Sequence, residues 1–279
     1  MDVVSALTEL GGISSYRALL TSVSRKQLRV ALDKGLVVRV CRGRYALPGG
    51  DLGLTAAREL GGHLSHLSAA THHGWEVALP TQWPQLIVPP GTRPPLSLAR
   101  PETWELVPRP GEVDGLATSP VLTVLLCARD LPFAEALAVA DSALRHGAVT
   151  WRQLDEAAAH WCRGNEAEVR RVVALADARA ANPFESMLRG LAIEAGLDVV
   201  PQWEIGPFHV DVADPLRGIA LEADSWEFHG DRVAFERDCR RYNQLVLADW
   251  IVLRYTWRQV VLAPRSVVEE LRRLACRVV

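Results

Sequence analysis

HVDVAD at residues 209–214 and ALEAD at residues 220–224 are two short segments in which carboxylates alternate with apolar side chains. The alternation predicts two β-strands, because successive side chains of a strand point to opposite faces. Turn-forming residues separate the segments, so we expect an antiparallel hairpin. These turn formers are Asp214, Pro215 and Gly218.

The alternation also assigns each side chain to a face of the expected hairpin. Asp211 is expected to point away from the face that Val210 and Val212 share. Glu222 and Asp224 share one face of the second strand, opposite apolar residues that we expect in the core. Antiparallel pairing then places Asp211 near Glu222. The side chains expected beside Asp211 are His209 and Ala213, and the expected core residues are Ile219, Leu221 and Ala223.

A carboxylate pair of this kind predicts a metal site. Two carboxylates roughly 4–5 Å apart repel by about 4 kcal/mol at an effective dielectric constant of about 20. A divalent cation reverses the sign of that interaction. Oxygen ligands suit Mg²⁺, Mn²⁺ or Ca²⁺ better than zinc, so we expect Mg²⁺ or Mn²⁺ as the cofactor.

Asp211, followed after ten intervening residues by Glu222-x-Asp224, resembles the PD-(D/E)xK signature of restriction-endonuclease-like nucleases. Over about residues 180–275 the chain is most similar to the branch grouped with very-short-patch repair endonucleases. Ser225 stands where that branch has glycine, and Asp224 stands where the wider superfamily has lysine. The segments that carry the resemblance are Pro183-Phe184-Glu185, Gln202, VDVADP at 210–215, Glu222-Ala223-Asp224-Ser225 with His229, and DWIVLRYT at 249–256.

The resemblance implies a divalent-metal-dependent endonuclease that hydrolyses phosphodiester bonds of double-stranded DNA. Asp211, Glu222 and Glu185 would hold one or two Mg²⁺ ions, which activate water and stabilise the charged transition state. His229 would take or give a proton, and Arg254 would neutralise phosphate charge. Because Asp224 replaces the lysine, the general base stays open. The catalytic residues implied by the resemblance are Glu185, Asp211, Glu222, Asp224 and His229.

Several of these residues also have a structural interpretation. Asn182, Pro183 and Glu185 fit the N-cap, first and capping-box positions of a helix. His229 follows the aromatic segment Trp226-Glu227-Phe228, where it fits a packing histidine. A charged run downstream is typical of a salt-bridged, solvated helix face. It comprises Arg237, Asp238, Arg240 and Arg241.

The N-terminal end of the chain is basic. Residues 1–50 carry eight Lys and Arg against three Asp and Glu, a net charge of +5, which leaves −7 for the remainder. Such an end binds polyanions locally. Its pattern predicts three helices and two strands, which together predict a winged helix-turn-helix. The expected helices cover residues 3–10, 15–20 and 24–34, and the expected strands cover 36–40 and 45–47.

The third of these helices would be the recognition helix. It begins at the N-cap Ser24 and ends at Gly35. Its apolar face is formed by Leu28, Ala31 and Leu32, and its opposite face is basic. The residues expected to bind DNA are Arg25, Lys26 and Arg29 on this helix, with Arg42 and Arg44 on the wing.

Residues 10–49 resemble the N-terminal domain of AbiEi-type antitoxins of type IV toxin–antitoxin systems. This resemblance implies a rival function, in which the protein is an antitoxin or transcriptional repressor with a cognate toxin as partner. The nuclease-like domain would then only bind DNA or a partner. Winged domains also serve as dimer or partner modules, so that interpretation stays open.

Residues 51–178 are expected to form a mixed strand-and-helix connector. The apolar run Leu86-Ile87-Val88 predicts a strand before proline-rich segments. Four histidines are interpreted as core or capping residues, because no Cys or acid completes a ligand set at a suitable spacing. These are His63, His66, His72 and His73, and the helices expected after Ser119 cover residues 121–129, 132–145, 150–161 and 166–180.

The length of 279 residues suits two or three domains. We expect an α/β protein of the multidomain α+β kind, with domains at 1–50, 51–178 and 179–279. No apolar run approaches the roughly twenty residues that cross a bilayer, and the N-terminus lacks a signal-peptide pattern. A cytoplasmic protein without a membrane partner is therefore expected. Its five scattered cysteines suit reduced thiols.

Overall fold

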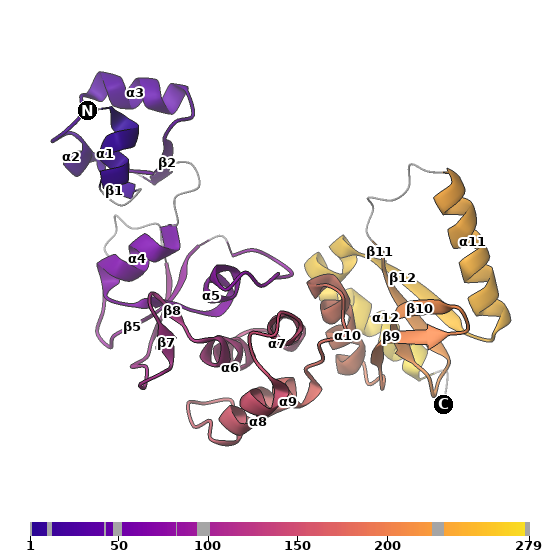
Figure 1. Ribbon diagram of the computed structural model, residues 1–279. Helices are drawn as coiled ribbons and strands as arrows, with labels where there is room; N and C mark the ends of the chain where they lie inside the picture. The colour runs from indigo at the N-terminus through magenta and orange to yellow at the C-terminus, as the bar shows by residue number, and fades with distance from the viewer. Residues whose placement is uncertain are drawn as a thin grey trace. The chain divides into compact units, whose positions relative to one another are not determined.

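The computed structural model forms two compact units of mixed α and β structure (Figure 1). The first comprises residues 1–72 and 81–123, and the second comprises residues 73–80 and 124–279. The mixed α/β class expected from the sequence is confirmed. Within the described ranges, no helix combines the length and apolar character needed to cross a membrane. Four cysteines are free thiols: Cys127, Cys162, Cys239 and Cys276. The structure describes residues 2–9, 13–41, 43–46, 52–81, 83–93, 101–224 and 232–276.

The N-terminal part of the first unit contains three helices and a three-stranded antiparallel sheet of order β1-β3-β2. The expected helices and the two expected strands are all present, and the sequence did not predict the short β1. Leu7, Leu19 and Leu28 are buried together and join the helices. The elements are α1 (Val3–Glu9), β1 (Ile13–Ser15), α2 (Tyr16–Leu19), α3 (Arg25–Asp33), β2 (Val38–Cys41) and β3 (Arg44–Ala46).

Helix α3 is capped at its start by Ser24 and followed at its end by Gly35. Oγ of Ser24 accepts a hydrogen bond from the backbone N of Gln27 at 3.2 Å, and Oε1 of Gln27 accepts one from the backbone N of Ser24 at 2.8 Å. This reciprocal capping box fixes the first turn. Gly35, with φ of +66°, follows the helix end. As predicted, Leu28 and Ala31 are buried.

The remainder of the first unit forms a five-stranded sheet of order β6-β5-β4-β8-β7. Gly62 lets the chain approach β5 closely, because a Cβ there would lie 2.4 Å from the carbonyl oxygen of Ile87. His66 is buried, and its Nδ1 contacts the hydroxyl of Ser65. The centroid of its ring lies 4.0 Å from the centroid of the Trp104 ring, so His66 has the packing role expected for it. The elements are α4 (Leu52–Leu60), β4 (His63–Leu64), α5 (His66–His72), β5 (Gln85–Val88), β6 (Glu102–Glu105), β7 (Val113–Asp114) and β8 (Ala117–Thr118).

Four helices follow, and they confirm the helical pattern expected after Ser119. The last of them ends at Leu175, so the prediction that it continues to residue 180 is wrong. Side chains hold the chain after this point: Arg189 donates to the carbonyl oxygen of Leu175, and Asp141 accepts from the backbone N of Asp177. The helices are α6 (Pro120–Asp130), α7 (Phe133–Arg145), α8 (Trp151–Ala159) and α9 (Glu166–Leu175).

The C-terminal part of the second unit is built on a four-stranded sheet of order β12-β11-β10-β9. Strands β9, β10 and β11 pair antiparallel, and β11 pairs parallel with β12. The hairpin expected from the HVDVAD and ALEAD segments is therefore confirmed. The elements are α10 (Pro183–Glu194), β9 (Val200–Ile205), β10 (Phe208–Asp214), β11 (Ile219–Asp224), α11 (Arg232–Leu247), β12 (Ile251–Thr256), the π-helix η2 (Arg258–Leu262) and α12 (Pro264–Ala275).

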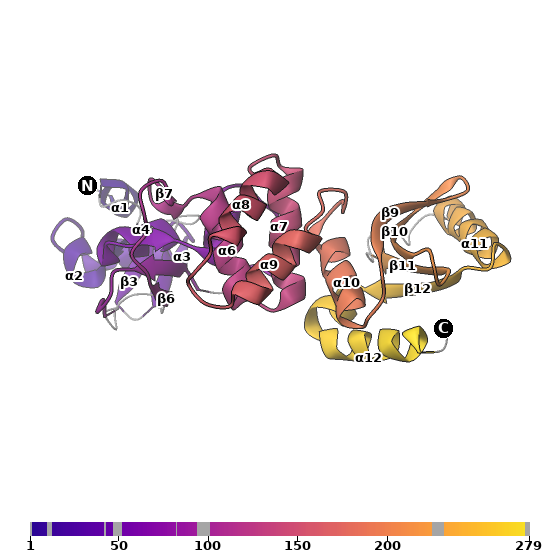
Figure 2. The same cartoon turned by 90° about the horizontal axis from the view of Figure 1, so that it is seen from below.

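Helices cover both faces of this sheet (Figures 1 and 2). Helices α10 and α12 pack against one face, and α11 packs against the other. Helix α7 packs against α10 on the same side of the sheet. Gly190 of α10 allows this close contact with Ala134 of α7, because it has no side chain. The first cluster includes Leu188, Val212, Ile219, Leu221 and Leu271, and the second includes Val210, Ala213, Ala220 and Leu245.

The expectation that Val210 and Val212 share a face is wrong. Val210 packs on the α11 side with Ala213, whereas Val212 packs on the α10 side. On β10, Val210 pairs with Trp203 of β9 and Val212 pairs with Pro201, so Asp211 lies opposite Gln202. Gln202 has a left-handed φ of +50°. The alternation of β10 is thus interrupted at the level where its neighbour β9 departs from extended backbone.

Candidate functional site

Asp211 of β10 lies beside Glu222 of β11. The pairing of Val212 with Leu221 places the two acidic residues at the same level of the hairpin. Oδ2 of Asp211 accepts a hydrogen bond from the backbone N of Ala223 at 2.8 Å. The structure therefore brings these carboxylates together, as the hairpin pattern predicted.

Glu222 is buried and Asp211 is partly buried, and the two carboxylates perturb each other. Burial raises the pKa of Asp211. Burial and then the charge of Asp211 raise the pKa of Glu222 to about 8, and the side chain of Glu222 is only 6% exposed. Near neutral pH the metal-free pair therefore holds a proton. Burial, and then like charge, disfavour ionisation of both carboxylates at once.

Arg241 of α11 is a cation that donates a hydrogen bond to this carboxylate pair. Its Nη2 donates to Oε1 of Glu222 at 2.6 Å and to the backbone oxygen of His209 at 2.5 Å. The side chain of Arg241 is 23% exposed, so its interpretation as part of a solvated helix face is wrong. This contact could not be predicted from the sequence, because Arg241 lies 19 positions after Glu222 and only the packing of α11 on the sheet joins them.

Asp224 forms a second ion pair at the end of β11. Its Oδ2 lies 2.6 Å from Nη2 of Arg254, a residue that the parallel pairing with β12 sets beside Glu222. The guanidinium of Arg254 lies 4.4 Å from the centroid of the Tyr242 ring. Burial and then the charge of Glu222 raise the pKa of Tyr242 to about 12. Asp224, at the position where the resembled superfamily has lysine, is thus a paired negative charge.

Glu185 is held at the start of α10 by hydrogen bonds to both of its oxygens. Oε2 accepts from the backbone N of Ala181 and from Nε2 of Gln202, each at 2.8 Å, and Oε1 accepts from Nδ2 of Asn182 at 2.8 Å. Burial and then the charge of Asp211 raise the pKa of Glu185. The capping interpretation of Asn182 is confirmed, since its side chain accepts from the first-turn N–H groups. The capping box expected of Glu185 is not formed, because its oxygens bind the backbone N of Ala181 and the side chains of Asn182 and Gln202 instead. Glu185 lies within electrostatic reach of Asp211.

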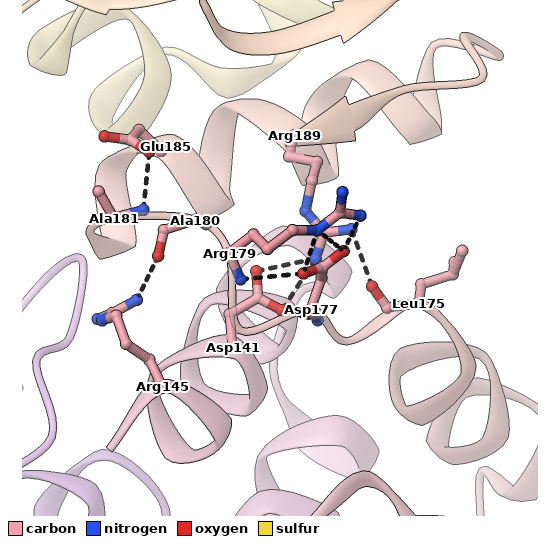
Figure 3. Close-up of polar contacts among 9 residues, drawn as sticks. All are labelled: Asp141, Arg145, Leu175, Asp177, Arg179, Ala180, Ala181, Glu185 and Arg189. Carbon is pink, nitrogen blue, oxygen red and sulfur yellow. Dashed lines mark hydrogen bonds and ion pairs between the residues drawn. The ribbon is translucent and has the colours of Figure 1, made fainter. Parts of the chain in front are cut away.

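A buried ion pair fixes the segment that leads into Glu185 (Figure 3). Nη2 of Arg189 contacts both oxygens of Asp141, at 2.9 and 2.8 Å, and Nη1 donates to the carbonyl oxygen of Leu175 at 2.8 Å. The side chains are 4% and 0% exposed. Figure 3 also shows Arg145 bound to the carbonyl oxygen of Ala180, one residue before the Ala181 that Glu185 binds.

The donor set at the candidate site suits a hard divalent cation held by two carboxylates. In the described ranges, no three His, Cys, Asp or Glu side chains form a group that could hold a metal ion. Asp211 and Glu222 remain as a pair of oxygen donors, of which Glu222 pairs with Arg241, and Mg²⁺ is commonly bound by one or two carboxylates plus water. His229 and Ser225 lie outside the described residues.

Two proteins of Mycobacterium tuberculosis are similar to this chain over most of its length. They are "Uncharacterized protein MT2308" of strain CDC 1551 / Oshkosh and "Uncharacterized protein Rv2248" of strain ATCC 25618 / H37Rv. Each is 31% identical over 247 residues, which are 83% of this chain and 89% of the relative. The chain belongs to their family.

No protein-family model matches the sequence. Among solved structures, "Crystal structure of RV2827C protein from Mycobacterium tuberculosis" is similar, with 19% identity and a TM-score of 0.39 over 66% of this chain and 78% of that chain. A likeness at this level carries no argument about fold or function.

The basic residues of α3 form the second candidate site. Arg25, Lys26 and Arg29 are exposed, as the sequence predicted. Arg42 lies outside the described residues, and Arg44 lies on β3. A cavity of about 350 Å³ opens beside α3 and is mainly apolar. Its lining includes Val3, Val4, Lys26, Val30 and Leu36.

Proposed function

We propose that this protein is a DNA-binding, divalent-metal-dependent endonuclease that hydrolyses phosphodiester bonds. The observation that carries the proposal is the adjacent pair of Asp211 and Glu222, in which burial and then the charge of Asp211 raise the pKa of Glu222 to about 8. Burying two adjacent carboxylates costs free energy that a bound cation would offset. The two residues would hold Mg²⁺ or Mn²⁺, which supplies an activated water and stabilises charge on the phosphate.

The other residues of the site would position and screen this chemistry. Gln202 links β9 to Glu185 and so fixes the start of α10 beside Asp211. Arg254 would neutralise phosphate charge from the neighbouring strand, where it now pairs with Asp224. His229 remains our proposed proton carrier. Glu185 would act as an outer carboxylate, because both of its oxygens already accept hydrogen bonds.

The N-terminal elements support DNA binding as a winged helix-turn-helix. Their order, α1-β1-α2-α3-β2-β3, ends in an antiparallel hairpin that follows the exposed basic helix α3. Such a helix reads base edges while neighbouring basic residues contact phosphates. We propose that residues 1–50 bring the protein to duplex DNA and that the C-terminal sheet forms the restriction-endonuclease-like domain.

A second function is favoured by the ion pairs on β11. Glu222 pairs with Arg241 and Asp224 pairs with Arg254, so guanidinium groups partly neutralise the strand without a metal. This arrangement supports the rival proposal of an AbiEi-like antitoxin or transcriptional repressor with a non-catalytic nuclease-like domain. The apolar cavity beside α3 would then suit a partner module, with a cognate toxin as partner.

Cleavage assays with the full-length protein separate the two functions. Purified wild type is incubated with duplex, nicked, mismatched and single-stranded DNA in Mg²⁺ or Mn²⁺. We expect cleavage or nicking that Glu222→Gln abolishes, because the variant lacks one of the two charged oxygen donors. Wild type that binds DNA but cuts none of these substrates in either metal would favour the repressor function.

A further inference from the structure

Arg241 occupies the place of a cation beside Glu222. Its Nη2 lies 2.6 Å from Oε1 of Glu222 and also binds the backbone oxygen of His209. The exposed fractions of the Arg241 and Glu222 side chains are 23% and 6%. This contact is therefore shielded from water, unlike the exposed ion pairs that contribute little to a fold.

A divalent cation at Glu222 would compete with this guanidinium. Both bind the same carboxylate, and Mg²⁺ requires its oxygen ligands at about 2.0–2.1 Å in a near-octahedral arrangement. Two cations that share one carboxylate repel each other strongly inside a protein. Arg241 must therefore leave Oε1 of Glu222, or weaken that contact, whenever a metal binds there.

The surroundings of Arg241 offer a second use for the released guanidinium. The Tyr242 ring lies 5.8 Å from the guanidinium carbon of Arg241 and 4.4 Å from that of Arg254. Both arginines therefore lie close to the same aromatic ring, near the end of β11 that carries Glu222 and Asp224. Paired guanidinium N–H groups match the oxygens of a phosphate better than an ammonium group does.

We propose that Arg241 is an exchangeable counter-ion, which pairs with Glu222 in the metal-free protein and transfers to a phosphate oxygen of the DNA when a divalent cation binds. The inference rests on the proposed endonuclease function and adds a residue that binds its substrate. It gives Arg241 two opposite effects. The side chain opposes metal binding, and it favours DNA binding once the metal is present.

Calorimetric titration of Mg²⁺ into the full-length protein tests the first effect. We expect Arg241→Met to bind Mg²⁺ roughly tenfold more tightly than wild type, because a charge-assisted hydrogen bond no longer competes with the metal. The titration is made at pH 9, where protons compete least for the carboxylates. Arg240→Met is the matched control, because it removes the same charge from an exposed neighbouring position on α11. Its affinity should stay within about twofold of wild type.

Fluorescence anisotropy with a short labelled duplex tests the second effect. The full-length protein carries Ala at Arg25, Lys26 and Arg29, so that α3 does not dominate the affinity. Mg²⁺ should increase DNA affinity relative to EDTA, and Arg241→Met should remove most of that gain while Arg240→Met keeps it. Gel analysis of the same samples checks that the duplex is intact.

The two effects have opposite signs, so a merely structural role of Arg241 would not reproduce them. Wild type that binds Mg²⁺, with equal or weaker binding by Arg241→Met, overturns the inference and leaves the proposed function standing. Absence of Mg²⁺ binding by both proteins overturns the metal-dependent function and the inference with it. If Arg241→Met does not fold, Arg241→Lys replaces it, and tighter Mg²⁺ binding by a few-fold is expected because one ammonium group fits the two acceptors less well.

Discussion

Replacement of Glu222 by Gln should stabilise the metal-free protein at high pH and change little at low pH. In the folded protein, burial and the charge of Asp211 raise the pKa of Glu222 from its ordinary value of 4.5 to about 8. Between these values the folded state holds a proton that the unfolded state has lost. Stability is therefore greatest below the lower value and is lost as pH rises through the folded-state pKa.

The magnitude follows from the difference between the two pKa values. Each pH unit between them changes the free energy of unfolding by about 1.36 kcal/mol, so a single isolated group would lose at most about 5 kcal/mol. Gln has no proton to lose, and the charged contact of Glu222 with Arg241 already lowers this pKa, so its loss is contained in the difference. We therefore expect Glu222→Gln to exceed wild type by up to about 5 kcal/mol at pH 9 in EDTA.

Urea denaturation followed by circular dichroism at pH 5 and pH 9 measures this difference. Glu204→Gln is the control. Glu204 lies on strand β9 of the same sheet, and its side chain is 73% exposed. The control should follow wild type at both pH values, since exposed charges contribute little. If Glu222→Gln is no more stable than wild type at pH 9, the repulsion between Glu222 and Asp211 is not what shapes the site.

Three further predictions concern other parts of the molecule. Changing both Arg25 and Arg29 to Ala should weaken salt-sensitive duplex binding by roughly tenfold in a salt titration, and an unchanged affinity would remove α3 as the recognition helix. Mg²⁺ or Mn²⁺ should raise the Tm of wild type, and Asp211→Asn should remove that increment without destabilising the metal-free protein; a Tm indifferent to both metals would argue against the site. Asp141→Asn should destabilise the fold by about 3–5 kcal/mol in urea, because the guanidinium of Arg189 stays buried without its carboxylate. The double change Asp141→Leu and Arg189→Met should recover most of that loss, and a single-variant effect below about 1 kcal/mol would contradict the reasoning.

Local patterns predicted much of the fold. The alternation around Asp211 and Glu222 gave both strands of the hairpin, and the caps at Ser24 and Asn182 gave the starts of α3 and α10. These signals work because side-chain alternation and capping act between neighbouring residues. Ile219 and Leu221, expected in the core from the same alternation, are fully buried.

Features set by distant contacts could not be predicted in this way. The end of α9 at Leu175 depends on the side chain of Arg189, which reaches back from α10. The loss of alternation at Asp211 lies level with the left-handed backbone of Gln202 on the neighbouring strand, a pairing that the local pattern does not specify. Arg241 occurs in a run of charged residues typical of an exposed helix, and only the packing of α11 directs it to Glu222. Such contacts need the fold before they can be inferred.

The charges at the candidate site also bear on which proposed function the structure favours. Asp224 and Arg254 form one neutral pair, whereas Asp211 and Glu222 lie together beside the guanidinium of Arg241. A domain that only had to neutralise its own strand would need no second carboxylate at this level, and a Gln at position 222 would remove the repulsion. Above the folded-state pKa of Glu222 the two carboxylates carry one more negative charge than Arg241 offsets, which suits a site that gains a divalent cation from solution.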